Sequence, residues 1–154
     1  MKRVLLALTT ACALGAVLPA YAQFRKPEDA IKYRQSTMFM MNTHFGRIAA
    51  MASGRAPFDA KAAADNAAMV ATLSSLPWSA FGDGTDMALP TRAKPEVWKE
   101  PAKFKEAADK LQVEVVKLDA AAKAGNLDQI KTAVGAVGRS CKACHDKYQS
   151  EDLK

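Results

Sequence analysis

One apolar seam near the end of the chain constrains the fold more than any other feature. Its members recur in alternating steps of four and three residues: Ile130, Val134, Val137, Cys141, Cys144 and Tyr148. Such steps keep side chains on one face of a helix, whereas in a strand they would point to both faces. The seam therefore predicts a helix that begins near Leu127 and buries one face against other elements.

Three earlier segments show helical periodicity, and no segment shows the alternation of a strand. We predict helices from about Pro27 to Met51, from about Asp59 to Leu76, and from near Pro101 to just before Gly125. The expected inward positions are Ile31, Met38, Met41, Phe45, Ile48 and Ala52, then Ala63, Ala67, Val70, Leu73 and Leu76, then Phe104, Ala108, Leu111, Val115, Leu118 and Ala122.

The connection over residues 77–100 is long and rich in glycine and proline, which predicts turns. Its aromatic side chains, Trp78, Phe81 and Trp98, suggest that it packs onto the helices. A short turn at residues 125–126 makes the last two helices antiparallel neighbours. Four amphipathic helices with mostly short loops predict an all-α fold, an antiparallel four-helix bundle.

Residues 1–22 have the pattern of a cleaved export signal. A basic start at residues 1–3 precedes an apolar stretch over residues 4–17, and Ala20-Tyr21-Ala22 fits a cleavage site. The apolar stretch is shorter than the roughly 20 residues that span a bilayer. We therefore expect cleavage after Ala22, no membrane anchor, and a single domain over residues 23–154.

The charge pattern argues against nucleic-acid binding. The net charge of the whole chain is +6, and losing Lys2 and Arg3 with an otherwise uncharged leader leaves +4. These charges are interspersed with acids along the chain and do not form a basic patch. We therefore interpret them as a solvated surface.

Two cysteines and one histidine form the motif that carries chemistry. Once Cys12 leaves with the signal, only Cys141 and Cys144 remain, and His145 follows them directly. Cys-x-x-Cys-His is the attachment signature of c-type haem. Positions three apart on a helix lie within about 5–6 Å, so both thiols can reach one edge of a porphyrin. We predict one covalently bound haem c, with His145 as the axial iron ligand.

Other uses of the same cysteines fit the sequence less well. A thioredoxin-like dithiol normally opens a helix after a strand, whereas this pair lies late in a long helix. A zinc site needs about four ligands, and the only other candidate after cleavage, His44, is distant in sequence. A structural disulfide would leave the adjacent histidine unexplained. Haem attachment accounts for all three residues.

A four-helix bundle with Cys-x-x-Cys-His close to its C-terminus resembles cytochrome c′, the class II c-type cytochromes of bacterial periplasms. The resemblance covers essentially the whole mature chain. Its most specific segments are Lys26-Pro27-Glu28-Asp29, Lys32-Tyr33-Arg34-Gln35, Leu76-Pro77-Trp78 with Phe81, Pro95-Glu96-Val97-Trp98 and Cys141-Lys142-Ala143-Cys144-His145-Asp146. It implies a periplasmic protein, a haem buried in the bundle, five-coordinate iron, and a homodimer built from the first two helices.

The resemblance also implies roles for four residues outside the motif. Met38 would close the distal face of the haem, Arg34 would contact a propionate with Gln35 beside it, and Trp78 would pack near the haem. From the residues alone, Arg34 lies on an apolar stripe where its charge needs a partner. A propionate would supply that partner, and snorkelling to water is the alternative.

Two positions depart from the common pattern of the family. A thioether can ligate haem iron, and a first-helix methionine does so in low-spin members. Met38 is the first candidate here and Met41 the second, whereas Met40 and His44 point away from that face. The position four residues after the haem histidine is often basic in the family, but here it is Gln149.

The resemblance implies a high-spin haem protein, not an enzyme, that binds small neutral gases such as NO and CO. It suggests nitric oxide buffering, with a capability for electron transfer to an unspecified redox partner. One alternative is a low-spin electron-transfer cytochrome with Met38 as the sixth iron ligand. Another is a non-haem adaptor that uses only the dithiol pair of Cys141 and Cys144.

Overall fold

The computed structural model describes residues 23–152, so the expected signal peptide lies outside the described part. Its long helices are α1 (Pro27–Ala52), α2 (Ala60–Ser74), α4 (Pro101–Lys123) and α5 (Leu127–Tyr148). A short 3₁₀ helix, η1 (Pro77–Ala80), and a single-turn helix, α3 (Glu96–Lys99), lie in the connection between α2 and α4. No strand occurs between residues 23 and 152, and the predicted all-α four-helix bundle is confirmed.

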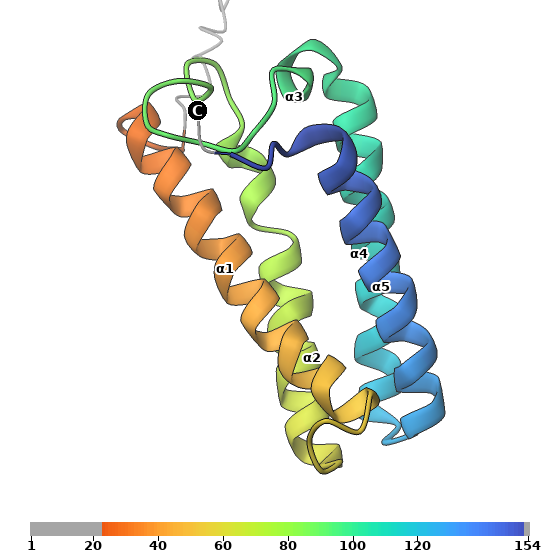
Figure 1. Cartoon of the computed structure of the whole chain (residues 1–154). Coiled ribbons are helices and arrows are strands. Elements are labelled where there is room, and N and C mark those ends of the chain that lie inside the picture. The colour runs from red at the N-terminus through yellow and green to blue at the C-terminus, as the bar shows by residue number, and fades with distance from the viewer. Residues whose placement is uncertain (1–22, 153–154) are drawn as a thin grey trace, which may run out of the picture.

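The long helices run antiparallel in chain order (Figure 1). Helix α1 packs on α2, α2 on α4, and α4 on α5, while α1 meets α5 less extensively. Helices α1 and α5 diverge toward the end of the bundle where residues 81–95, here named the crossing loop, cover the top. Among residues 23–152, no helix has the length and apolar character needed to cross a bilayer.

Local signals set the helix ends. Pro27 occupies the first turn of α1, where its missing N–H costs nothing. The Asp59 carboxylate accepts a hydrogen bond from Ala62 N–H at 2.9 Å and so caps α2. Beyond α1 and α4, Gly54 and Gly125 take positive φ angles of 75° and 66°, which glycine adopts without steric cost.

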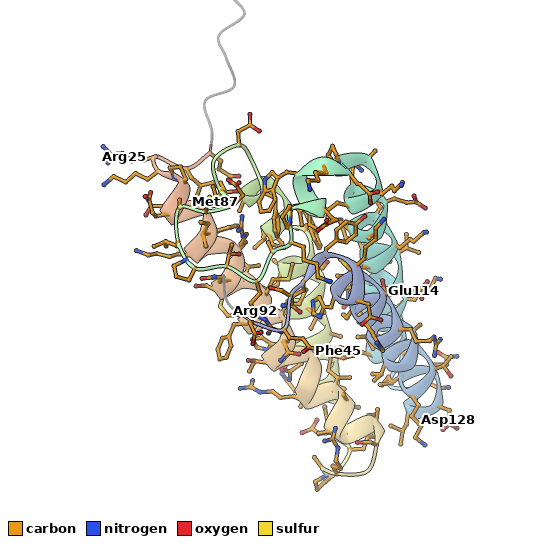
Figure 2. All side chains as sticks on the ribbon, turned by 45° about the horizontal axis from the view of Figure 1, so that its top comes forward. Arg25, Phe45, Met87, Arg92, Glu114 and Asp128 are labelled. Atoms are coloured by element: carbon orange, nitrogen blue, oxygen red, sulfur yellow. The ribbon has the colours of Figure 1, made fainter. Side chains whose placement is uncertain are left out.

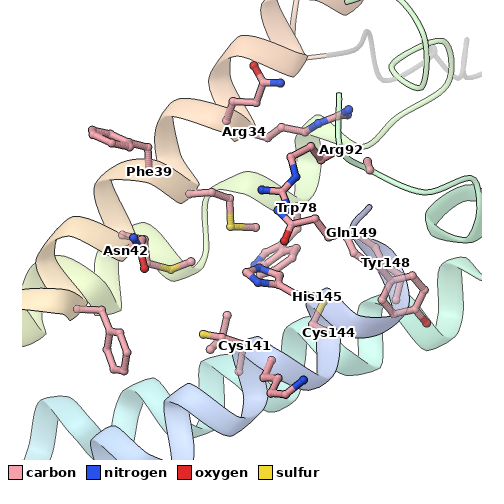
Figure 3. A pocket seen from close by; sticks show the side chains of 18 of the residues that line it. Arg34, Phe39, Asn42, Trp78, Arg92, Cys141, Cys144, His145, Tyr148 and Gln149 are labelled. Atoms are coloured by element: carbon pink, nitrogen blue, oxygen red, sulfur yellow. The ribbon is translucent and has the colours of Figure 1, made fainter. Parts of the chain in front are cut away.

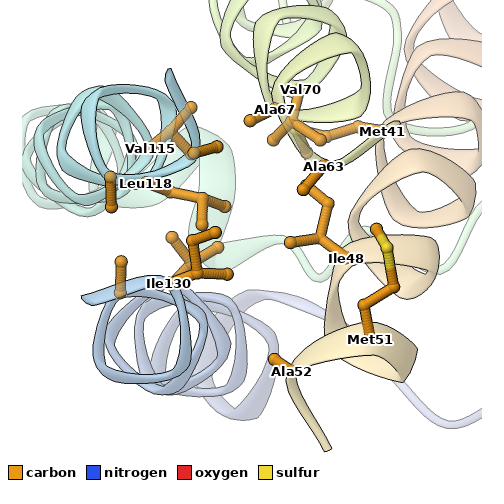
Figure 4. Packing of buried hydrophobic residues seen from close by; sticks show 14 of the residues in the cluster. Met41, Ile48, Met51, Ala52, Ala63, Ala67, Val70, Val115, Leu118 and Ile130 are labelled. Atoms are coloured by element: carbon orange, nitrogen blue, oxygen red, sulfur yellow. The ribbon is translucent and has the colours of Figure 1, made fainter. Parts of the chain in front are cut away.

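The predicted inward faces meet in one aliphatic core (Figure 4). Ile48 from α1, Leu118 from α4 and Ile130 from α5 are fully buried. Alanines 63 and 67 of α2 lie against them, and their small size lets the helices approach closely. On the outer surface, Glu114 and Asp128 point away from the bundle (Figure 2).

The prediction that Leu76 belongs to this core is wrong. Helix α2 ends at Ser74, and Leu76 is 37% exposed. The N–H of Leu76 bonds to the carbonyl of Leu73, three residues back, at 3.2 Å. This tighter 3₁₀-type turn rotates Leu76 off the inward face of the helix.

Candidate functional site

A cavity of about 820 Å³ lies between the diverging helices α1 and α5. This volume falls within the roughly 300–1,000 Å³ that cofactor and small-molecule sites occupy. Its lining is mainly apolar and comes from all four long helices: Met38, Met41, Phe45, Val70, Phe104, Leu111, Val115 and Val137. The cavity is therefore suited to a large, mostly apolar group.

The Cys-x-x-Cys-His motif forms the α5 wall of the cavity (Figure 3). Cys141 and Cys144 lie one helical turn apart, are half-buried, and are not joined in a disulfide. Burial raises the pKa of Cys141, and burial together with the Cys141 charge raises the pKa of Cys144 to about 11. Redox-active dithiols depend on a lowered thiol pKa, so this environment disfavours the dithiol adaptor.

His145 presents its imidazole to the same cavity (Figure 3). Partial desolvation and, second, the charge of Arg92 lower the pKa of His145, while Asp146 opposes them. A lowered pKa favours the neutral imidazole, which is the form that binds metals. Among residues 23–152, no group of three or more His, Cys, Asp or Glu side chains is arranged to hold a metal ion.

The α1 wall faces this motif with two methionines. Met38 is half-buried, Met41 is buried, and both line the cavity, whereas Met40 is 44% exposed and does not. His44 is also absent from the lining, and its Nδ1 lies 2.8 Å from Asn66 Oδ1 on α2. Asn42 lines the cavity as well, at an exposed position of α1 that sequence reasoning missed.

Arg34 is buried at the loop end of the cavity and is 2% exposed, so the snorkelling alternative is wrong. Its two terminal nitrogens donate to Ala80 O, Thr85 Oγ1, Thr85 O and Thr91 Oγ1 at 2.8–3.1 Å. Its guanidinium also lies 4.5 Å from the ring centroid of Phe81. Burial lowers the pKa of Arg34 to about 10, against the opposing charge of Asp86.

These bonds change what the charge of Arg34 implies. The protein itself supplies acceptors for both terminal nitrogens, from η1 and the crossing loop. The need for a partner therefore no longer favours a propionate. Within residues 23–152, the Nε–H of Arg34 is its one donor without a protein acceptor. A haem propionate could therefore accept a hydrogen bond from Nε.

Gln35 and Trp78 lie at the same end of the cavity and line it. Gln35 Nε2 donates to Pro90 O at 3.1 Å, which fastens the crossing loop to α1. Trp78 Nε1 donates to Ser74 O at 2.6 Å, and its ring packs edge-on against Phe104 with centroids 5.8 Å apart. The indole thus offers an apolar, rigidly held face to whatever fills the cavity.

The crossing loop is tied to the C-terminal end of α5, a contact that sequence reasoning missed. Ala93 and Gln149 form an antiparallel bridge, Lys94 N donates to Tyr148 O at 2.9 Å, and Ser150 N donates to Arg92 O at 2.7 Å. Arg92 thereby joins the lining beside His145 and Gln149. No periodicity marks residues 91–94, so no sequence signal could have found this contact.

Comparison with known proteins agrees with this geometry. The family model "Cytochrome C'" matches residues 29–149. The cytochrome c′ of Rubrivivax gelatinosus is 59% identical over 84% of this chain and 100% of its own length. Its crystal structure superposes with a TM-score of 0.81 over 83% of this chain and 100% of that one.

A second solved structure is a nitric oxide complex of a variant of cytochrome c′ from Alcaligenes xylosoxidans. It is 48% identical, has a TM-score of 0.78, and covers 84% of this chain and 100% of its own. The family match spans every helix that lines the cavity, including the Cys-x-x-Cys-His motif. With this motif, this bundle and these relatives, the chain belongs to the cytochrome c′ family of c-type haem proteins.

Proposed function

We propose that this chain carries one covalently bound haem c and binds small neutral gases, nitric oxide and carbon monoxide, at its iron. The observation that carries the proposal is the placement of Cys141, Cys144 and His145 together on the α5 wall of an apolar cavity. The donor set fits the group, because two thiols one turn apart match one porphyrin edge and a neighbouring imidazole can act as axial ligand. The bound haem would supply the gas-binding iron and one-electron redox chemistry.

The wall opposite His145 decides which ligands are favoured. Met38 and Met41 have no hydrogen-bond donor, so a bound ligand gains no polar stabilisation from them. The polar lining residues on α1 are Arg34, whose terminal nitrogens are bonded to η1 and the crossing loop, and Gln35 and Asn42, which are exposed. The amide nitrogen of Gln35 is already bonded to Pro90 O. This arrangement favours nitric oxide and carbon monoxide over dioxygen, whose bound form needs hydrogen-bond donors for its stabilisation. The nitric oxide complex of the Alcaligenes relative supports the same ligand class.

The visible spectrum of the purified holoprotein tests this proposal. We expect a covalent haem that survives denaturing electrophoresis and acid-acetone extraction, high-spin bands, and a spectral change on adding CO to the reduced protein. A colourless protein, or pigment that the extraction removes, would contradict it.

The second candidate function is electron transfer by a low-spin haem with Met38 as sixth ligand. It is favoured by one observation, that Met38 and Met41 both line the cavity on the wall that faces the motif. A low-spin spectrum that becomes high-spin in Met38→Leu would establish it. An unchanged high-spin spectrum in this variant would leave Met38 as a steric gate to gas binding.

The proposal extends to location and assembly. The leader pattern of residues 1–22 and the haem attachment motif support export to the periplasm, where nitric oxide buffering and electron exchange, not substrate turnover, would be the role. Exposed apolar side chains on α1 and α2, among them Phe39 at 72% and Met69 at 44%, support a homodimer through these helices. Sedimentation of the holoprotein and of Phe39→Glu would test the dimer, which the charge should disrupt.

A further inference from the structure

Three cationic side chains line the cavity, and they differ in the hydrogen-bond partners of their charged groups. Both terminal nitrogens of Arg34 are bonded to η1 and the crossing loop. The Lys142 ammonium donates to both carboxylate oxygens of Asp146, at 2.8 and 2.7 Å. Arg92 makes a single side-chain bond, from Nε to Ser150 O at 2.7 Å. Within the described chain, its terminal nitrogens have no protein acceptor.

The backbone holds Arg92 in place from both sides. Ser150 N donates to Arg92 O at 2.7 Å, and the next residue, Ala93, forms a bridge with Gln149. These contacts tie Arg92 to the end of the helix that carries the haem-attachment motif. They hold the backbone of Arg92 close to the end of α5 that carries His145.

Arg92 lines the cavity together with His145. Figure 3 shows the Arg92 side chain extending from the crossing loop toward Gln149, on the same side of the cavity as His145. Arg92, which is exposed, and His145 line the same cavity, and Gln149, the bridge partner of Ala93, donates its N–H to His145 O at 2.9 Å. The carboxylate next to His145 in sequence, Asp146, is paired with Lys142. Lys94 also brings a cation to this end of α5, where its ammonium donates to Asp146 O at 2.9 Å, but of the two only Arg92 lines the cavity within the described residues.

We propose that Arg92 is a positioning residue that sets the reduction potential of the haem through its fixed positive charge beside His145. This inference rests on the proposed function, because it needs a haem iron ligated by His145. Reduction adds one electron and lowers the charge of the haem by one. A nearby cation stabilises the reduced form relative to the oxidised form, so Arg92 raises the potential and favours ferrous iron, the form that binds CO.

The test compares charge removal at Arg92 with the same change elsewhere. Arg92→Gln removes the cation, Arg92→Lys keeps it, and Arg55→Gln removes an arginine from the turn after α1, at the opposite end of the bundle. Each holoprotein is equilibrated with a redox dye at a fixed dye ratio, and the ferrous-to-ferric ratio is read from the spectrum. We expect Arg92→Gln to lower this ratio by roughly three- to tenfold, and the other two variants to stay within about twofold.

Two results would overturn the inference: equal ratios in Arg92→Gln and Arg55→Gln, or an Arg92→Lys ratio as low as that of Arg92→Gln. If Arg92→Gln loads no haem, the inference is tested with Arg92→His instead. An imidazole at this position loses its charge between about pH 5 and 8. Its ferrous-to-ferric ratio should then fall with rising pH more steeply than that of the parent, and parallel pH profiles would contradict us. A parent protein without covalent haem would instead refute the proposed function itself.

Discussion

The two halves of the bundle share the same apolar periodicity, but one half forms a packed core and the other lines a cavity. In the half around Ile48, Leu118 and Ile130, which we name the closed half, buried aliphatic side chains pack against one another (Figure 4). In the half around Met38 and Cys141, the open half, α1 and α5 diverge and leave the cavity. An apolar stripe therefore shows which face of a helix turns inward, but not whether its partner there is protein or cofactor.

Size and shape of the side chains explain the difference. The closed half pairs branched residues such as Ile48 and Leu118 with the small Ala63 and Ala67, which allows close packing. The open half is covered at its end by an aromatic cluster, with Phe104 5.1 Å from Tyr148 and 4.9 Å from Phe81 between ring centroids. These rings pack on one another and on Arg34, and so support the rim of the cavity without filling it.

The largest expected effect comes from removing the covalent attachment in the open half. The double variant Cys141→Ser with Cys144→Ser should lose all covalent haem, because no thiol remains to form a thioether. Haem staining after denaturing electrophoresis measures this loss directly. The closed half contains neither residue, so helical circular dichroism should persist. Haem that stays covalently bound in this variant would contradict the attachment site.

A pair of truncations on α5 tests the comparison by stability. Ile130 is fully buried in the closed half, whereas Val134, one turn later, is only partly buried. Ile130→Ala should lower the free energy of unfolding by about 2–5 kcal/mol, and Val134→Ala by a smaller amount because less packing is lost. Urea denaturation of the haem-loaded protein gives both values. Equal losses would mean that Val134 is packed as tightly as Ile130.

The rim of the open half should depend on Arg34. Arg34→Met keeps much of the apolar stem but removes four hydrogen bonds to η1 and the crossing loop. Since buried carbonyls would lose their donors, we expect a loss of about 2–4 kcal/mol in the free energy of unfolding. Limited proteolysis within residues 82–90 should also become faster. Gln35→Ala, which removes one exposed bond to the same loop, serves as the matched control.

Features set by local sequence could be predicted, whereas features set by the crossing loop could not. The bounds of the four long helices were predictable to within two residues, because Pro27, Asp59 and Gly125 mark them locally, whereas η1 and α3 were not predicted. The haem-attachment motif could also be recognised from the sequence, since its three residues lie within five positions of one helix. The partners of Arg34 and the placement of Arg92 were not, because both depend on the path of the crossing loop. That path is set by contacts between residues more than 45 positions apart in the chain.

A smaller effect is expected at the gas-binding side of the open half. If Met38 obstructs the site opposite His145, Met38→Ala should tighten CO binding to the reduced protein by roughly tenfold, about 1.4 kcal/mol. Spectroscopic CO titration measures this change. Met40→Ala provides the control, because Met40 lies on the same helix but outside the cavity. Equal affinities in the parent and Met38→Ala would show that Met38 does not obstruct the ligand.

The two ends of the bundle also differ in how their helices begin. At the closed end, the side chains of Asp59 and Asn126 cap α2 and α5, whereas α1 and α4 begin at the open end with proline and no side-chain cap. Asp59→Ala should lower the free energy of unfolding by about 1 kcal/mol, because Ala62 N–H loses its acceptor. Lys26→Ala, at the uncapped start of α1, should change it far less. Urea denaturation that gave equal losses for both would mean that side-chain capping does not distinguish the closed end from the open one.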